Sequence, residues 1–243
     1  MNAVLLLLAI NLVQATAEKV DASKLSTTPV VQDAKWAQSW WMKRHEEKLA
    51  AKGDGKDVEL LWIGDSITHG WENGGKAVWD KFYAKRNAFN LGFSGDRTEH
   101  VLWRLENGAV QGMSPKVTVM MIGTNNTGHR KEKAEYTTAG IKAILDQLHE
   151  RMPETKVLLL AVFPRGEQPD HEMRQINNDV NKQIQRFADG KQVHFLDIGD
   201  KFLDEAGVLP EDIMPDALHP NAKGYQIWAE AIEDKLASLL GES

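Results

Sequence analysis

The feature that most constrains the fold is the regular alternation of apolar runs and helical stretches that begins after Gly53. Five runs have the length and composition of buried strands: Val58–Ile63, Ala88–Phe93, Val117–Ile122, Val157–Phe163 and Val193–Ile198. Stretches typical of helices fall between and after them, near 76–84, 98–107, 132–151, 171–189 and 221–240. Strands that alternate with helices form βαβ units. The sequence therefore predicts an α/β fold, a three-layer α/β/α sandwich with a five-stranded parallel sheet.

The residues ahead of this pattern predict export. Residues 4–10 are apolar, and Ala15-Thr16-Ala17 has the small-x-small pattern of a cleavage site. We therefore expect a signal peptide over 1–17 and a periplasmic or extracellular protein. A buried N-terminal helix is the alternative, because no Lys or Arg precedes the apolar run. Residues 18–32 are expected to be a flexible segment. Residues 33–243 are expected to form a single domain that starts with a helix over 33–51.

Composition excludes several functional classes. With 243 residues, 42% of them hydrophobic, the chain can bury one large core without disulfides or a structural metal. A net charge of −6 and the lack of a long basic run argue against nucleic acid and anionic membranes as partners. The absence of cysteine excludes a thiol nucleophile. His45-Glu46 and His171-Glu172 do not complete a zinc-binding His-Glu-x-x-His. We predict no metal, no cofactor and no stable membrane anchor.

Ser66, Asp216 and His219 are the candidate catalytic residues. Ser66 follows the first predicted strand, so its hydroxyl lies at the carboxyl edge of the sheet, where open α/β sheets bind ligands. A serine hydroxyl becomes a good nucleophile when an imidazole takes its proton and a carboxylate holds that imidazole. Asp216 and His219 are three residues apart, so one turn can direct both side chains inward. These residue types indicate acyl transfer.

Gly95 and Asn125 are the candidate residues of an oxyanion hole. Gly95 follows the second predicted strand and Asn125 follows the third, so both come to the same edge of the sheet as Ser66. A backbone N–H and a side-chain amide can stabilise the negative oxygen of a tetrahedral intermediate. Gly-Asp-Ser alone is a common turn, and Asp-x-x-His alone is a common helix start. The combination is more specific than any one of its parts.

Four further residues are candidates for substrate binding: Asp65, His69, Trp71 and Arg165. Trp71 could form a rim on which a sugar ring stacks, although burial in the local loop is an equal alternative. His69 either lines the pocket or lies on an exposed loop. Arg165 follows the fourth strand and either touches the substrate or makes a structural ion pair.

Several segments together resemble one family, the SGNH or GDSL hydrolases. They are Gly64-Asp65-Ser66-Ile67-Thr68, Gly95-Asp96-Arg97-Thr98 with the following His100–Leu105, Gly123-Thr124-Asn125-Asn126, Phe163-Pro164-Arg165-Gly166 and Asp216-x-x-His219. Within this superfamily the chain is similar to the branch that contains the catalytic subunits of platelet-activating-factor acetylhydrolase Ib. The resemblance covers about residues 36–236. It departs from the usual Gly-x-Asn-Asp block only at Asn126.

The resemblance implies a flavodoxin-like fold and a role for each candidate residue. Ser66 would be the nucleophile, His219 the general base and acid, and Asp216 the residue that orients His219. The N–H groups of Ser66 and Gly95 and the amide of Asn125 would bind the oxyanion. Dimers occur in the resembling branch, so a homodimer is a further expectation.

The substrate is expected to be a small-molecule or glycan ester with a short acyl group. The predicted domain has no long apolar insertion that could cover a fatty acyl chain, which favours acetyl. The alcohol is either an acetylated carbohydrate or, from the branch resemblance, a phospholipid-like ester. The rival hypotheses are a lysophospholipase or thioesterase, and a non-catalytic carbohydrate-binding protein on the same fold.

Overall fold

The central layer is a parallel sheet with the strand order β2-β1-β3-β4-β5. The computed structural model of the protein describes residues 21–242. Its strands are β1 (Leu60–Gly64), β2 (Ala88–Gly92), β3 (Val117–Met121), β4 (Lys156–Leu160) and β5 (Val193–Leu196). Each overlaps a predicted run, with only Gly64 and Lys156 lying one residue beyond it, and each pairs in parallel with its neighbours. The predicted five-stranded parallel sheet is confirmed.

The strands are apolar because both faces of the sheet are buried. All five residues of β1 and all five of β3 are buried. Alternate residues of β1 enter two separate hydrophobic clusters, Leu61 and Ile63 on one face and Leu60 and Trp62 on the other. A parallel strand covered on both sides reads as a continuous apolar run, which is why the sequence pattern located these strands.

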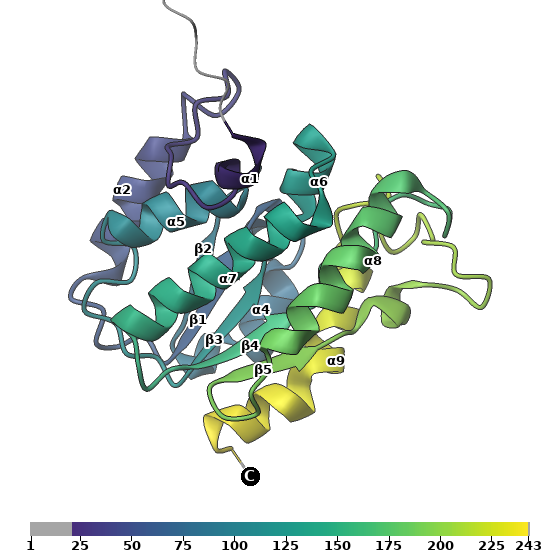
Figure 1. Ribbon diagram of the computed structural model, residues 1–243. Helices are drawn as coiled ribbons and strands as arrows, with labels where there is room; N and C mark the ends of the chain where they lie inside the picture. The colour runs from purple at the N-terminus through teal and green to yellow at the C-terminus, as the bar shows by residue number, and fades with distance from the viewer. Residues whose placement is uncertain (1–20, 243) are drawn as a thin grey trace, which may run out of the picture.

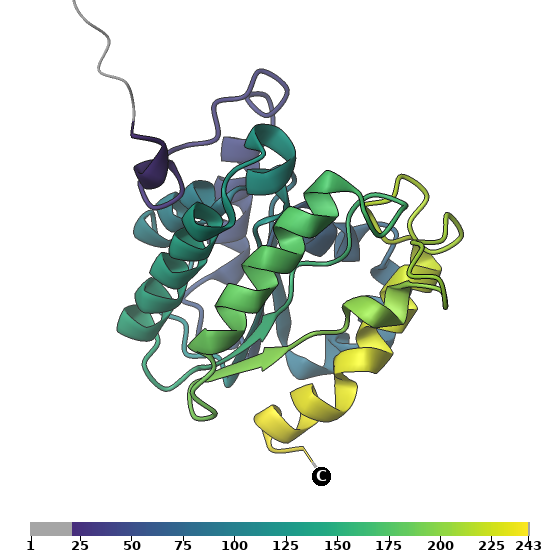
Figure 2. The same ribbon diagram turned by 45° about the vertical axis from the view of Figure 1, so that its right-hand side comes forward.

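Helices cover both faces of the sheet (Figures 1 and 2). One face carries α2 (Trp41–Lys52), α5 (Thr98–Glu106), α7 (Ala134–Arg151) and α8 (Glu172–Ile184). The other carries α3 (Ser66–His69), α4 (Lys76–Phe82) and the long α9 (Ala222–Leu240). The remaining short helices are α1 (Ala22–Leu25), α6 (Thr124–Arg130), η1 (Gly70–Glu72), η2 (Ala84–Arg86), η3 (Gln185–Phe187) and η4 (Gly199–Phe202). These layers make the predicted α/β/α sandwich.

The direction in which successive strands are added to the sheet reverses between β1 and β3. The chain leaves β1 toward β2 on one side and then returns to add β3, β4 and β5 on the other. In open α/β sheets the loops at such a point diverge and leave a crevice at the carboxyl edge. Ser66 follows β1 and Asn125 follows β3, so both lie at this crevice.

The described part of the predicted flexible segment, residues 21–32, instead packs against the domain, so the prediction is wrong for these residues. Ser26 and Gln32 are buried. The Thr98 hydroxyl donates a hydrogen bond to the Ser26 carbonyl at 2.9 Å, and Asn126 donates to the Ser26 hydroxyl at 3.0 Å. Two polar side chains of the segment, Ser26 and Gln32, thus satisfy buried polar groups of the domain.

The helix predicted over 33–51 begins only at Trp41, after a series of turns. The predicted signal peptide, residues 1–17, lies outside the described residues. Across residues 21–242 we find no helix with the length and apolar character needed to cross a bilayer.

Candidate active site

Ser66 is the first residue of α3, directly after the turn that ends β1. Its side chain is partly buried. The turn depends on Gly64: a β carbon there would lie 2.1 Å from the Thr68 hydroxyl oxygen and 2.6 Å from the Met121 carbonyl oxygen. Only glycine therefore lets α3 turn back so tightly over β1 and β3. This turn holds the Ser66 hydroxyl at the carboxyl edge of the sheet.

Asp216 and His219 reach Ser66 from a turn that precedes α9. The Ser66 hydroxyl lies 2.8 Å from His219 Nε2, and His219 Nδ1 lies 2.6 Å from Asp216 Oδ2. Because a carboxylate only accepts, Nδ1 donates to Asp216, which leaves Nε2 free to accept the Ser66 proton. The structure thus brings the three predicted catalytic residues into one hydrogen-bonded series.

The Asp216 carboxylate is stabilised in its charged form. Partial burial alone would raise the pKa of Asp216, but hydrogen bonds from the His219 side chain and from backbone N–H groups outweigh this, and the pKa is lowered. Asp216 Oδ1 accepts from the N–H of Leu218 at 3.1 Å and of His219 at 2.7 Å. The neighbouring Ala217 has a φ of 53°, the left-handed conformation that closes the turn. A charged Asp216 can hold the His219 tautomer that catalysis needs.

Three hydrogen-bond donors lie around the loop that follows β2. Gly95 has a φ of 74°. Within the described residues, the N–H groups of Gly95 and Ser66 have no hydrogen-bond partner. The amide of Asn125 donates one hydrogen bond to the Asp96 carbonyl at 3.0 Å, which fixes its position beside Gly95. An amide nitrogen has two protons, so the second is available to a ligand. These donors fit the predicted oxyanion hole.

The loop of Gly95 is braced by a buried ionic group that sequence reasoning did not single out. Asp96 is fully buried and accepts from Trp41 Nε1 at 2.6 Å and from Arg104 Nε at 2.9 Å. Burial raises the pKa of Asp96 to about 6, and Arg104 opposes this shift. Gln32 donates to the Gly95 carbonyl at 3.1 Å. Hydrogen bonds from Trp41, Arg104 and Gln32 therefore fix the backbone that carries the Gly95 N–H.

The departure of Asn126 from the family pattern has an electrostatic reason. Its amide donates to Glu132 at 2.8 Å and, at 3.5 Å, to Glu99, while its oxygen accepts from the Thr98 N–H at 3.1 Å. All these groups are buried. An aspartate here would set a third carboxylate against two others. The asparagine amide instead donates a hydrogen bond to each of the two carboxylates.

Two of the four candidate substrate-binding residues are buried, and these predictions are wrong. Trp71 is 0% exposed and packs in an aromatic cluster, 4.5 Å from the Tyr225 ring and 5.0 Å from the Trp228 ring between centroids. Asp65 is also 0% exposed and caps α3 by accepting the Ile67 N–H at 3.0 Å. Neither side chain can reach a substrate. Both support the turn that carries Ser66.

The other two candidates, His69 and Arg165, are partly exposed at the site edge. His69 Nδ1 lies 2.9 Å from the Ser94 hydroxyl, which links α3 to the loop of Gly95. Burial lowers the pKa of His69 to about 4, so the ring is neutral at pH 7. Arg165 donates to the Thr124 carbonyl at 2.7 Å, beside Asn125. Burial lowers the pKa of Arg165, while the charges of Asp65 and Asp216 oppose this shift. Their contact with substrate stays a prediction.

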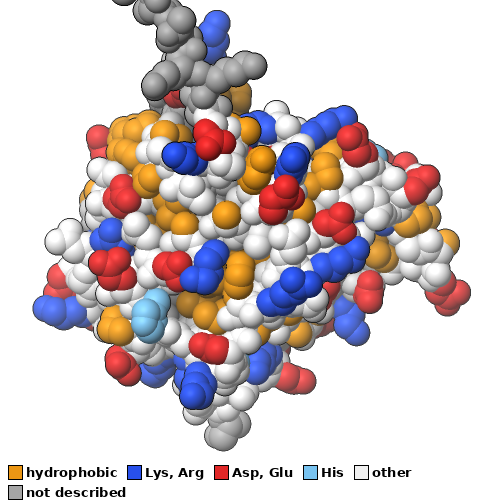
Figure 3. Space-filling view, viewed as in Figure 1, with side chains coloured by type: hydrophobic (Ala, Val, Ile, Leu, Met, Phe, Trp, Pro, Cys, Tyr) orange, Lys and Arg blue, Asp and Glu red, His pale blue; other side chains and the backbone are white. Residues whose placement is uncertain are grey.

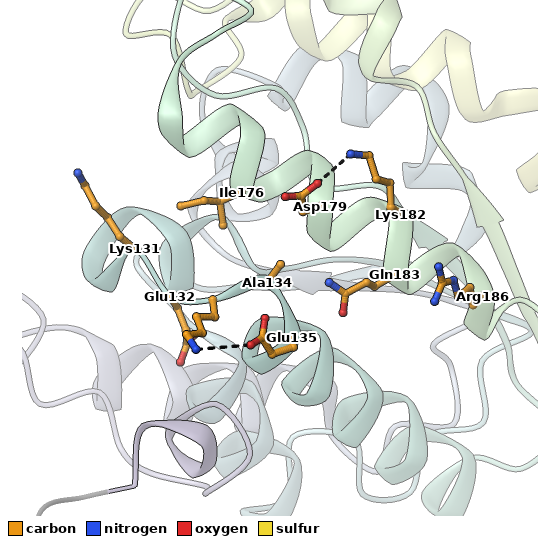
Figure 4. Close-up of a pocket in the computed structure, with 10 residues that line it drawn as sticks. Lys131, Glu132, Ala134, Glu135, Ile176, Asp179, Lys182, Gln183 and Arg186 are labelled. Atoms are coloured by element: carbon orange, nitrogen blue, oxygen red, sulfur yellow. Dashed lines mark hydrogen bonds and ion pairs between the residues drawn. The ribbon is translucent and has the colours of Figure 1, made fainter.

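A groove on another part of the surface is not part of this site. It has a volume of about 540 Å³ and lies between the start of α7 and one side of α8 (Figure 4). Its lining is of mixed charge, with Lys182 paired to Asp179 at 2.8 Å and Lys133 to Glu135 at 3.9 Å. None of the predicted site residues lines it. The described residues also contain no group of three metal-ligating side chains.

The buried Asp65 gives a stability prediction. Burial raises its pKa to about 7, from an ordinary value of 3.8. The folded state thus holds this proton more tightly than the unfolded chain, so the group costs stability as the pH rises from about 4 to 7. Asp65→Asn keeps the cap without the charge. Relative to the parent, its free energy of unfolding should improve by about 2–4 kcal/mol between pH 4 and pH 8.

Urea denaturation of both proteins at the two pH values measures this difference. Asp80→Asn is the control, because Asp80 is largely exposed on α4 and pairs with Lys76. An Asp65→Asn difference from the parent that is the same at pH 4 and pH 8 would contradict the prediction.

The fold and the site geometry define an α/β ester hydrolase. Residues 62–227 match the sequence profile of the GDSL-like Lipase/Acylhydrolase family. Platelet-activating factor acetylhydrolase IB subunit alpha1 of Homo sapiens is 37% identical over 206 residues, which cover 83% of this chain and 85% of that protein. The chain belongs to the GDSL-like lipase/acylhydrolase family.

Solved structures share the fold at lower identity. A GDSL-like lipase from Bacteroides thetaiotaomicron is 22% identical with a TM-score of 0.66, covering 81% of this chain and 97% of that one. An acetylxylan esterase from Geobacillus stearothermophilus is 19% identical with a TM-score of 0.60, covering 77% of this chain and 96% of that one. The predicted SGNH hydrolase fold is thereby confirmed.

Proposed function

We propose that this protein hydrolyses acetyl esters through an acyl-enzyme on Ser66. The observation that carries the proposal is the series from the Ser66 hydroxyl to His219 Nε2 at 2.8 Å and from His219 Nδ1 to Asp216 at 2.6 Å. It lies at the carboxyl edge of the sheet, near the N–H groups of Ser66 and Gly95, which have no hydrogen-bond partner among the described residues. This is the arrangement that a two-step acyl transfer requires.

In the first step the Ser66 oxygen attacks the ester carbonyl and its proton passes to His219 Nε2. The carbonyl oxygen becomes negative and accepts hydrogen bonds from the N–H groups of Ser66 and Gly95 and from the Asn125 amide. The intermediate collapses, the bond to the alcohol breaks, and the alcohol leaves with the proton from His219. Acetyl is then bound to Ser66.

In the second step water replaces the alcohol. His219 takes a proton from the water as it attacks the acetyl carbonyl. The bond to Ser66 breaks, and His219 returns the proton to the serine oxygen. Acetate is released and the enzyme is restored. Asp216 stays charged throughout and stabilises the imidazolium in both steps.

Two observations support acetyl as the acyl group. The human relative is by name an acetylhydrolase. In addition, the His219 and Asp216 side chains are 42% and 56% exposed, so the reacting residues face solvent. An open site suits a small acyl group attached to a larger alcohol, because the alcohol can stay outside. A long acyl chain would need apolar cover around it.

Labelling with a fluorophosphonate tests the nucleophile. We expect intact mass to rise by one adduct, and peptide mapping to find it on Ser66. Ser94, the other serine near the site, is the internal control and should stay unlabelled. An adduct on Ser94, or no adduct on an enzyme that hydrolyses esters, would contradict the mechanism.

A chain-length series tests the acyl group. We expect kcat/KM for p-nitrophenyl acetate to exceed that for the decanoate by at least about tenfold, since each extra methylene must be accommodated without apolar cover. A preference for decanoate would favour the lysophospholipase or thioesterase alternative instead.

We also propose that the protein is exported. The support is the apolar run and the cleavage pattern in residues 1–17, which lie outside the described residues. N-terminal sequencing of the mature protein should begin at Glu18. A mature protein that keeps Met1 would contradict export by this signal. A homodimer also stays a prediction.

A further inference from the structure

The exposed large hydrophobic residues of the described chain lie in one short segment. Val30 is 42% exposed, Val31 37% and Trp36 51%. Figure 3 shows hydrophobic side chains gathered at the upper left of this face, on the side of the molecule where α2 lies in Figure 1. An exposed tryptophan is informative when it adjoins a site, because a free indole face leaves a large apolar area in water.

Trp36 lies directly against the proposed oxyanion loop. A β carbon built on Gly95 would be 2.0 Å from the Trp36 Cη2 atom, so the edge of the indole touches the Gly95 backbone. Gly95 supplies one of the N–H groups beside Ser66. The edge of the indole therefore lies beside the residue whose N–H would bind the ester carbonyl oxygen.

Trp36 continues into a row of rings that leads to the helix of Ser66. Its ring is stacked on Trp40, with centroids 6.2 Å apart and planes 29° apart. The Trp40 ring lies 6.0 Å from the His69 ring. His69 is on α3, three residues after Ser66. The aromatic row, Trp36, Trp40 and His69, thus borders the site from the oxyanion loop to α3.

Hydrogen bonds fix the turn that carries Trp36 against the rest of the domain. Trp40 Nε1 donates to the Trp36 carbonyl at 3.1 Å. On the two flanks of this turn, Gln32 donates to the Gly95 carbonyl and the Trp41 indole donates to Asp96. The exposed indole is thus placed by the same contacts that fix the oxyanion loop. A side chain fixed in this way loses little freedom when a ligand binds.

We propose that Trp36 binds the alcohol part of the substrate, and that this part is a sugar ring stacked on the indole. This inference rests on the proposed function. A single indole face matches one face of a pyranose, whose C–H groups contact the ring while its hydroxyls stay in water. Polar side chains follow both oxyanion residues in the chain, with the Arg97 guanidinium 3.2 Å from the His129 ring. A long alkyl chain would need a continuous apolar groove rather than one aromatic face.

Trp36→Ala tests the inference with two substrates. For an O-acetylated methyl xyloside we expect KM to rise about 10–30-fold, with a much smaller change in kcat. For ethyl acetate, which has no ring to stack, kcat/KM should change by no more than about threefold. Trp36→Tyr should recover most of the lost affinity for the xyloside, because it restores an aromatic face.

Val31→Ala is the matched control. It removes exposed apolar surface from the same segment but not from the face over Gly95, so both substrates should react as with the parent. Equal losses on ethyl acetate and the xyloside would overturn the inference, because Trp36 would then only support the oxyanion loop. An unchanged KM for the xyloside would overturn it as well.

The result is separable from the proposed function. If the parent hydrolyses ethyl acetate but not the acetylated xyloside, the sugar assignment fails and the acetyl-ester function stands. An equal effect of Trp36→Ala on an acetylated glycerophospholipid would also overturn the sugar assignment. If ethyl acetate and the xyloside are both untouched by the parent, the proposed function fails, and the inference fails with it.

Discussion

Ser66→Ala is expected to lower kcat/KM for p-nitrophenyl acetate by about 10⁴–10⁶-fold. The substitution removes the hydroxyl whose oxygen lies 2.8 Å from His219 Nε2. Without it no acyl-enzyme can form, and only the donors around Gly95 remain to polarise the carbonyl. Stability should change little, because the Ser66 hydroxyl is at the site surface. Initial rates and thermal unfolding of parent and variant measure both effects.

Ser94→Ala is the matched control for this experiment. Ser94 lies in Gly92-Phe93-Ser94-Gly95, close to a nucleophile pattern, and its hydroxyl is 2.9 Å from His69 rather than from His219. We expect this variant to keep its activity within about threefold. If Ser94→Ala were inactive and Ser66→Ala were active, the assignment of the nucleophile would be reversed.

The sheet could be predicted from sequence because its physical cause is local. Strands buried on both faces need a continuous apolar run, and each of the five strands overlaps one. The short helices α3 and α6 could not be predicted. α3 has only four residues, too few for a periodic pattern to show. α6 has the sequence Thr-Asn-Asn-Thr-Gly-His-Arg, which contains no large apolar residue and so no apolar face. They are determined by the turns that leave β1 and β3.

The errors in the site come from contacts between residues far apart in the chain. The Trp71 indole has one polar N–H group, and Trp71 follows Ser66 by five residues in the chain. The sequence therefore allowed it a position at the rim of the active site. Its burial depends on Tyr225 and Trp228, more than 150 residues later. In the same way, Gln32 is part of the site support only because Gly95, 63 residues away, accepts its hydrogen bond. No local pattern carries such information.

The catalytic series was accessible to sequence reasoning for the opposite reason. Ser66 and Asn125 lie within four residues of the ends of β1 and β3, so the parallel sheet alone brings them to one edge. Asp216 and His219 share one turn, which only has to reach that edge. Trp36 was predicted as part of a helix, yet it precedes α2 and lies on Gly95. Its position follows from the turn before Trp41, which the spacing of the tryptophans does not reveal.

The second large effect is expected for Asn125→Ala, with kcat for p-nitrophenyl acetate about 10²–10³-fold lower and KM little changed. The amide stabilises charge that exists only in the tetrahedral intermediate, so its loss raises the barrier rather than weakening substrate binding. The variant also loses the hydrogen bond to the Asp96 carbonyl, which costs about 1 kcal/mol of stability. Steady-state kinetics and urea denaturation separate the two effects.

Asn126→Ala is the control that distinguishes a catalytic amide from a structural one. Asn126 is the next residue and has the same side chain, but its amide binds Glu132 and the Ser26 hydroxyl instead of facing Ser66. Its removal takes one donor from buried Glu132, which keeps its ion pair with Arg130, and leaves the buried Thr98 N–H without its acceptor. It should therefore cost more stability than Asn125→Ala, about 2–4 kcal/mol. The folded Asn126→Ala enzyme should keep kcat within about tenfold, because the oxyanion donors remain. If Asn125→Ala lost only stability and kept kcat, the negative oxygen would be stabilised by backbone N–H groups alone.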